Sequence, residues 1–118
     1  MDKHELAERT MNFAVRVLKM ADHLPNTVSG RAVGAQIARS GTSIAANYRA
    51  ALRGKSRADF INKITIVLEE ADETEFWIEL TKRAGLLPAG RLDELQLEAG
   101  ELVRIFNATR TTAKNRKS

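Results

Sequence analysis

Apolar residues recur every three or four positions along most of this 118-residue chain, and that spacing places them on one face of an α-helix. The pattern predicts four long helices, over residues 3–23, 27–53, 57–84 and 89–109. Long helices with short connections favour an all-α fold, an antiparallel up-down-up-down four-helix bundle. We expect the bundle to occupy residues 1–110 and residues 111–118 to form a basic, disordered tail.

Residues that start or stop helices stand at the ends of these segments. Leu24-Pro25-Asn26 ends the first helix, because proline disfavours helical backbone before it and lacks an amide donor. Ser56, with Asp59 three residues later, is typical of a capped helix start. Gly85 suits the position just after a helix end.

The second predicted helix combines an apolar face with many small residues. Its inward positions are Val33, Ile37, Ser40, Ile44, Asn47 and Ala51. Glycine inside a helix is destabilising by about 0.5–1 kcal/mol relative to alanine, so the glycines here indicate a neighbour that approaches closely. A polar Asn47 on this face needs hydrogen-bond partners, which Ser40, Ser43 or a facing acid can supply. We interpret it as a core asparagine that fixes the packing register.

The third predicted helix has the most regular apolar face and also apolar residues outside it. The face consists of Phe60, Ile64, Val67, Ala71, Thr74 and Ile78. Ile66, Phe76 and Trp77 lie elsewhere on the helix and predict a subunit interface, with partial cover by another element of the same chain as the alternative. The first helix has a wider apolar arc than a surface helix needs. Together these surfaces favour a homo-oligomer.

The composition limits the environment of the protein. The chain contains no cysteine, which excludes disulfides and thiolate metal sites. Its N-terminus lacks the apolar stretch of a signal peptide, and no segment has the roughly 20 apolar residues of a membrane span. We therefore expect a soluble, cytoplasmic protein with no membrane contact.

Charge is distributed unevenly within the net +4. Residues 25–63 carry seven Lys and Arg against one Asp, whereas residues 64–80 carry six acids and no base. Six cations form a stripe on the outer face of the second helix and in the turn after it: Arg31, Arg39, Arg49, Arg53, Lys55 and Arg57. Such a stripe can contact nucleic-acid phosphates without reading bases. The alternative is a solvated face, or ion pairs to the acidic helix of another subunit.

The sequence contains no convincing motif for catalysis or for binding a cofactor. Gly54-Lys55-Ser56 resembles the end of a phosphate-binding loop, but Arg49 stands where that motif needs glycine. The acids at 69–73 mostly face outward and lack the histidines of a di-iron bundle. The two histidines have no partner at informative spacing. We expect a protein that is not an enzyme, with no cofactor and no metal.

The pattern Arg39, Ser43-Ile44-Ala45-Ala46-Asn47, a following Arg/Gly/Lys/Ser turn and Asp59-Phe60-Ile61 resembles a known family. It is similar to the four-helix-bundle proteins encoded in intervening sequences of bacterial large-subunit ribosomal RNA genes, and to the accessory variability protein of diversity-generating retroelements. The resemblance spans about residues 12–106. Many relatives continue after the asparagine with Ile-Ala-Glu-Gly, whereas this chain has Tyr48-Arg49-Ala50-Ala51, which makes the outer face more basic.

The resemblance implies a barrel-like homopentamer with a basic surface, and, in the retroelement branch, association with a reverse transcriptase and nucleic acid. It identifies Arg39, Ser43 and Asn47 as family-motif positions with a structural or functional role. Two hypotheses follow. The protein binds RNA or DNA through its basic face, or it is a scaffold for a protein such as a reverse transcriptase and has no direct nucleic-acid role.

Overall fold

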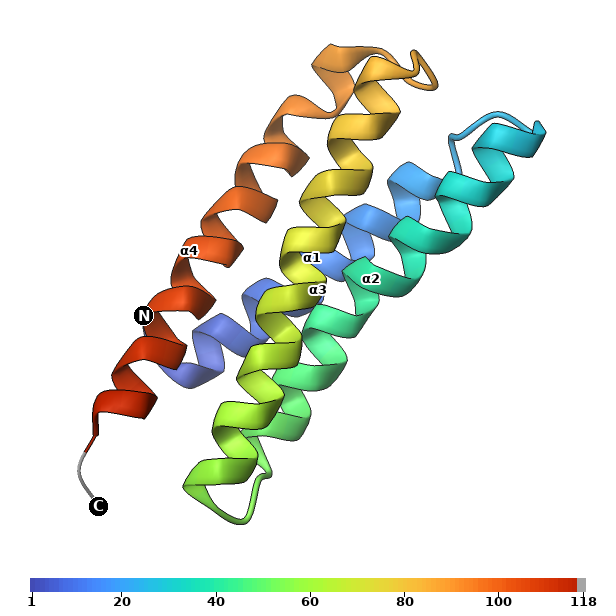
Figure 1. The fold of residues 1–118 in the computed structure, drawn as a ribbon. Coiled ribbons are helices and arrows are strands. Elements are labelled where there is room, and N and C mark those ends of the chain that lie inside the picture. The colour runs from blue at the N-terminus through green and yellow to red at the C-terminus, as the bar shows by residue number, and fades with distance from the viewer. Residues whose placement is uncertain (117–118) are drawn as a thin grey trace.

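The computed structural model describes residues 1–116 and contains four long antiparallel helices joined by short connections (Figure 1). The helices are α1 (Lys3–Ala21), α2 (Val28–Leu52), α3 (Arg57–Arg83) and α4 (Asp93–Asn115), with a short 3-10 helix, η1 (Ala89–Arg91), before α4. No strand occurs within these 116 residues. The predicted all-α class and the four helices are therefore confirmed.

Side chains cap three of the helices where the sequence places Asp, Thr or Ser. The carboxylate of Asp2 accepts a hydrogen bond from the backbone N–H of Glu5, at 2.8 Å. Thr27 caps α2 in the same way, and Ser56 caps α3 by accepting from the N–H of Asp59 at 3.1 Å. These oxygens satisfy amide groups that have no partner inside the helix. Gly85 follows α3 with φ of 65°, a backbone conformation that glycine adopts without strain.

The last helix is longer than predicted. α4 continues past the expected end at Thr109 to Asn115, so residues 111–115 are helical and not a disordered tail. Arg57, at the start of α3, donates to the carbonyl oxygens of Ala113 and Lys114 at 2.9 and 2.8 Å. These carbonyls belong to the last turn, where no intrahelical donor is available. Residues 117 and 118 of the predicted tail lie outside the described part of the chain.

Each helix packs mainly against its neighbours in sequence. α2 and α3 form the central pair, α1 packs on α2 and α4 packs on α3, whereas α1 and α4 touch little. Figure 1 shows α1 crossing behind the other helices. The centre holds fully buried side chains from all four helices: Phe13, Val17, Ile37, Ile44, Ile64, Val67, Ile78, Leu102 and Phe106.

The inward face of α2 differs from the prediction near its end. Asn47 is only half-buried, and its amide nitrogen donates to the carbonyl and the hydroxyl of Ser43, at 2.9 and 2.8 Å. Tyr48 is the buried residue of this turn, with 3% of its surface exposed and its ring centroid 5.2 Å from that of Phe106. Asn47 therefore lies at the edge of the core. Of the partners predicted for it, Ser43 is the one that it contacts.

Candidate nucleic-acid interface

The arginines of α2 are all exposed, as the outer stripe requires, but their surroundings differ. Arg31 lies near the start of the helix, and its guanidinium donates to Asn26 at 2.9 Å. Arg49 lies in the last turn of α2, and Arg53 directly follows the helix. The helix rises about 1.5 Å per residue, so Arg31 and Arg53 are separated by roughly 30 Å along it.

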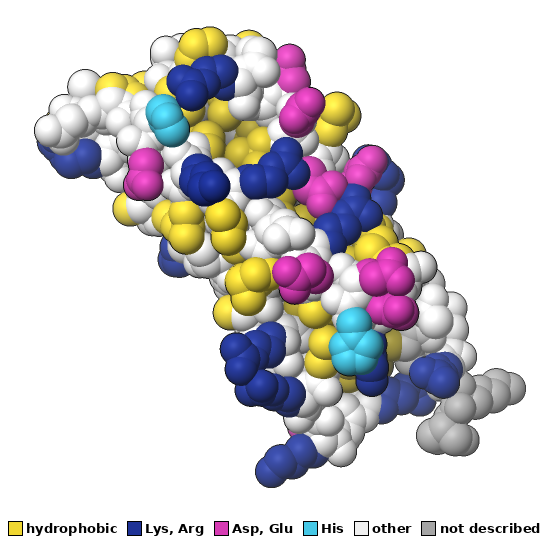
Figure 2. Space-filling model, turned by 180° about the vertical axis from the view of Figure 1, so that it is seen from behind, with side chains coloured by type: hydrophobic (Ala, Val, Ile, Leu, Met, Phe, Trp, Pro, Cys, Tyr) yellow, Lys and Arg dark blue, Asp and Glu magenta, His cyan; other side chains and the backbone are white. Residues whose placement is uncertain are grey.

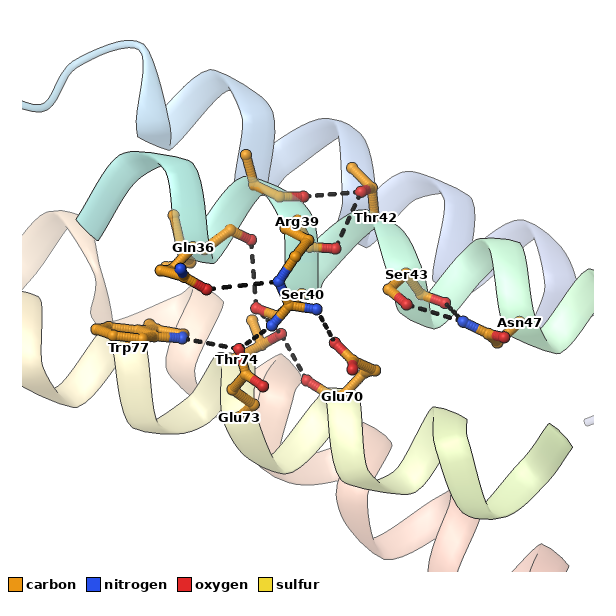
Figure 3. Close-up of polar contacts among 12 residues, drawn as sticks. Gln36, Arg39, Ser40, Thr42, Ser43, Asn47, Glu70, Glu73, Thr74 and Trp77 are labelled. Atoms are coloured by element: carbon orange, nitrogen blue, oxygen red, sulfur yellow. Dashed lines mark hydrogen bonds and ion pairs between the residues drawn. The ribbon is translucent and has the colours of Figure 1, made fainter. Parts of the chain in front are cut away.

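Arg39, in the middle of the stripe, is neutralised by the acidic face of α3 (Figure 3). Its guanidinium binds Glu70 at 3.0 Å and also forms an ion pair with Glu73. The hydrogen bonds that Arg39 donates to Glu73, and secondly to Glu70, raise the pKa of Arg39. Glu73 also accepts from the indole N–H of Trp77, at 3.1 Å. The alternative to nucleic-acid contact was that the stripe pairs with the acidic helix of another subunit. At Arg39, such ion pairs form with the acidic helix of the same chain.

The family-motif residues lie one turn apart along α2. Arg39 connects α2 to α3, whereas Ser43 and Asn47 bond to each other within α2 (Figure 3). Next to Arg39 in sequence, the buried Ser40 has its hydroxyl 2.8 Å from that of Thr74 on α3. The ion pairs of Arg39 and the hydrogen bonds between Ser43 and Asn47 therefore stabilise the fold of one chain.

Beyond Arg39, the cations at the C-terminal end of the basic stripe are not engaged in ion pairs in the described part of the chain. Within residues 1–116, Arg49, Arg53 and Lys55 form no ion pair, and all three are exposed. Arg57 is bonded only to backbone carbonyls, which are polar but uncharged. Its positive charge therefore remains available to a ligand.

The fold brings the end of α4 to this same region. The two bonds from Arg57 hold residues 113 and 114 against the start of α3, so Lys114 and Arg116 join the cations of the α2–α3 turn. We call this group the basic end: Arg49, Arg53, Lys55, Arg57, Lys114 and Arg116. Figure 2 shows Lys and Arg side chains gathered at the end of the molecule where the chain finishes.

Lys114 and Arg116 were not predicted as members of a site, because their polar, basic surroundings in the sequence are typical of a disordered tail. No local pattern signals the contact, since Arg57 and Ala113 are distant in sequence. The structure thus divides the predicted stripe. Four of its six cations belong to the basic end, whereas Arg31 lies apart and Arg39 is paired with acids.

The three residues predicted to form a subunit interface have different environments. Phe76 is 56% exposed and Ile66 is at the border of exposure. Trp77 is half-buried against the core, with its ring centroid 5.0 Å from that of Phe76. Trp77 is therefore partly covered by its own chain, while Phe76 and Ile66 offer apolar surface to a partner.

The acids of α3 form no metal site in the described residues. Glu70 and Glu73 are engaged by Arg39, and no group of three His, Asp or Glu side chains within residues 1–116 is placed to hold an ion. None of the helices in this part of the chain is both long and apolar enough to span a bilayer.

A known protein family matches almost the whole chain. A family model described as 23S rRNA-intervening sequence protein matches residues 2–108. The chain belongs to this family. The match covers α1, α2 and α3 and most of α4, and it confirms the resemblance found in the sequence.

A solved structure resembles this member of the intervening-sequence family throughout. It is a protein of unknown function from the S23 ribosomal protein family of Bacteroides thetaiotaomicron. The two share 36% sequence identity and superpose with a TM-score of 0.82, over 88% of this chain and 96% of the other. A search of curated proteins found no match.

Proposed function

We propose that this intervening-sequence family member is a cytoplasmic, non-enzymatic homo-oligomer that binds RNA or DNA at the basic end. The observation that carries the proposal is the convergence of six cations there, none of them paired with an acid within residues 1–116. Unpaired Arg and Lys side chains bind phosphates by displacing condensed counterions, whatever the base sequence. The described surface offers Phe76 as its one strongly exposed aromatic ring, so base stacking contributes little.

A competing explanation is that these cations only stabilise helix ends. α2 and α4 both finish at the basic end, and cations near a helix C-terminus contribute roughly 0.3–1 kcal/mol each. The two explanations differ in what a charge reversal changes. Helix-end stabilisation predicts a lower melting temperature alone, whereas phosphate binding predicts lost affinity at a temperature where the variant is fully folded.

Exposed apolar residues support the proposed assembly. One surface, on α1 and α2, presents Met11, Val15, Leu18 and Leu52. The opposite pair of helices presents Phe76 on α3 and Leu97 on α4, the latter 68% exposed. Two unlike surfaces that meet head to tail generate a closed ring when the rotation closes. We propose the pentamer that the family resemblance implies, in which basic ends repeat and their phosphate contacts add.

The decisive experiment measures binding by charge-reversed variants. Fluorescence anisotropy would follow a labelled structured RNA and a duplex DNA from low to physiological salt. Arg49→Glu with Arg53→Glu should weaken binding of both at least tenfold and lower the slope of log affinity against log salt by about 2, because two phosphate contacts are lost.

The matched control is Arg31→Glu with Arg83→Glu, which changes net charge equally at exposed positions outside the basic end. It should retain most of the affinity. Equal losses in the two double variants, or no binding by the wild type even at low salt, would contradict the proposal.

Protein scaffolding is the second candidate, and the exposed Phe76 on the acidic α3 favours it. A client such as a reverse transcriptase would then bind through protein contacts. Affinity capture from nuclease-treated native lysate separates the candidates. A partner that survives nuclease and is lost with Phe76→Glu supports the scaffold, whereas loss of all partners on nuclease treatment supports nucleic-acid binding.

A further inference from the structure

A groove of about 830 Å³ opens at the basic end, between the first turns of α1 and α3 and the last three turns of α4. Its wall is mostly apolar, with Leu6 from α1, Phe60 from α3 and Ile105 from α4. Contact with phosphates does not account for an apolar wall. The groove is therefore a feature that nucleic-acid binding leaves unexplained.

The groove exists because α1 covers only part of α4. The two helices meet where Arg9 binds Glu98 at 2.7 Å and also pairs with Glu101. The same face of α4 continues at helical spacing through Ile105, Ala108 and Thr112. No helix within residues 1–116 lies over this continuation. The open position is the one that a fourth helix occupies in a fully packed bundle.

The α4 side of the groove is lined by small side chains. Ala108, Thr109, Thr112 and Ala113 follow one another along it, beyond the larger Ile105. Packed helices lie 8–10 Å apart, and the distance depends on the side chains at the contact. A surface of Ala and Thr permits the short end of that range, and Leu6, Phe60 and Ile105 offer a place for a large apolar side chain.

The charge of the groove has one sign. Its lining includes Arg57 and Arg116 and no acid. Neither guanidinium forms an ion pair with an acid within residues 1–116, so both charges are open to a ligand. An apolar groove with a basic edge complements a helix that is apolar on one face and acidic beside it.

We propose that this groove binds an acidic amphipathic helix of a partner protein, laid along the last three turns of α4. The apolar face of the partner helix would contact Leu6, Phe60 and Ile105, and its carboxylates would lie against Arg57 and Arg116. The groove shares Arg57 and Arg116 with the basic end but does not include Arg49, Arg53 or Lys55. Variants of those three residues therefore test phosphate binding without changing the groove, and either proposal can fail alone.

The probe is a labelled synthetic peptide of about 18 residues, long enough to form a helix, with Leu at positions i, i+3, i+4 and i+7 and Glu on the flanks. Its partner probe has Lys in place of every Glu. Binding to the full chain would be measured by fluorescence anisotropy, and backbone amide shifts in ¹⁵N spectra would locate it.

Two adjacent threonines of α4 provide the variants. Thr112 lines the groove, whereas Thr111 does not, and both are exposed, so neither substitution disturbs the core. Thr112→Glu should weaken the acidic peptide at least tenfold, and Thr111→Glu should leave its affinity within about twofold. Amide shifts should centre on Ile105, Ala108 and Thr109, and the Lys peptide should bind at least tenfold more weakly.

Several results would overturn the proposal. They are no binding of the acidic peptide, equal effects of the two threonine substitutions, or equal binding of the Lys peptide. Displacement of the peptide by dodecanoate at lower concentration than the peptide itself needs would assign the groove to a fatty acid instead. A drop in oligomer mass in Thr112→Glu alone would assign it to a second copy of this chain.

Discussion

At the scale of single residues, Gly41 of α2 is a position where α1 approaches closely. A Cβ atom added there would lie 2.7 and 2.9 Å from the two methyl carbons of Val17, a fully buried residue of α1. Gly34, two turns earlier on α2, would meet only the end of the Leu24 side chain, at 3.4 Å. Glycine thus permits α1 to pack closely at one position, and at the other it is not required.

Substitution by alanine should have opposite effects at these two glycines. Gly41→Ala should lower the free energy of unfolding by about 1–3 kcal/mol, because overpacking a buried contact outweighs the better helix propensity of alanine. Gly34→Ala should raise it by about 0.5–1 kcal/mol through propensity alone. Urea unfolding followed by circular dichroism measures both, and a Gly41→Ala protein as stable as the wild type would contradict the packing argument.

Sequence reasoning identified the small residues of α2 as sites of close approach, and the contact with Val17 confirms this. It placed Asn47 inward and overlooked Tyr48, because a 3-4 periodicity drifts by a fraction of a turn over a 25-residue helix. The choice between two adjacent residues depends on which one meets Phe106 across the core. That information lies in α4 and not in α2.

At the scale of elements, one ion-pair cluster joins α1 to α4. Arg9 binds Glu98 through two hydrogen bonds of 2.7 Å, and it also pairs with Glu101. The hydrogen bond from Arg9 lowers the pKa of Glu98 below its ordinary value of 4.5. The side chain of Glu98 is only 15% exposed, so water screens the pair less than it screens a surface pair.

This cluster predicts a pH dependence of stability. Because the pKa of Glu98 is lower in the folded state than in the unfolded state, its contribution is present above pH 4.5 and is lost as the pH falls through the folded pKa. Glu98→Gln should cost about 1–2 kcal/mol at pH 7 and much less at pH 3. Melting temperatures from pH 7 to 3 test this, with the exposed Glu8→Gln as control. A parallel shift at every pH would refute the assignment to Glu98.

The capping residue Ser56 made the start of α3 predictable, since it bonds to the amide of Asp59 three residues later. The end of α4 was not predictable in this way. Its last carbonyls are satisfied by Arg57, a residue of another helix, so a segment with the composition of a disordered tail is ordered by a tertiary contact.

At the scale of the whole molecule, the cations of the basic end lie at one end of an elongated body of 51 × 21 × 20 Å, where α2 and α4 finish and α3 begins. The imbalance between the basic and acidic segments was evident in the sequence, but the positions of these charges in the fold were not. Arg39 is neutralised by ion pairs with α3 inside the chain, whereas the cations around the α2–α3 turn lie beside the end of α4. The packing of α3 against both α2 and α4 decides this division.

The proposed ring predicts that apolar surface, and not the basic end, holds the assembly together. Phe76→Glu or Leu18→Glu should lower the mass measured by light scattering to that of smaller species, because a charge would be buried at the contact. Thr111→Glu, a change at another exposed position outside both surfaces, should leave the mass unchanged. A wild-type protein that is monomeric at micromolar concentration would exclude the ring.

The order of packing, in which each helix rests on its neighbours in sequence and α1 barely meets α4, also bears on how the chain reaches its structure. Most contacts close short loops, so little chain entropy is lost before each contact forms. Proteins with such local topologies fold in about microseconds to milliseconds. A nascent chain of this kind can assemble α1, α2 and α3 while the residues of α4 are still being added, and it exposes apolar surface only briefly on the way.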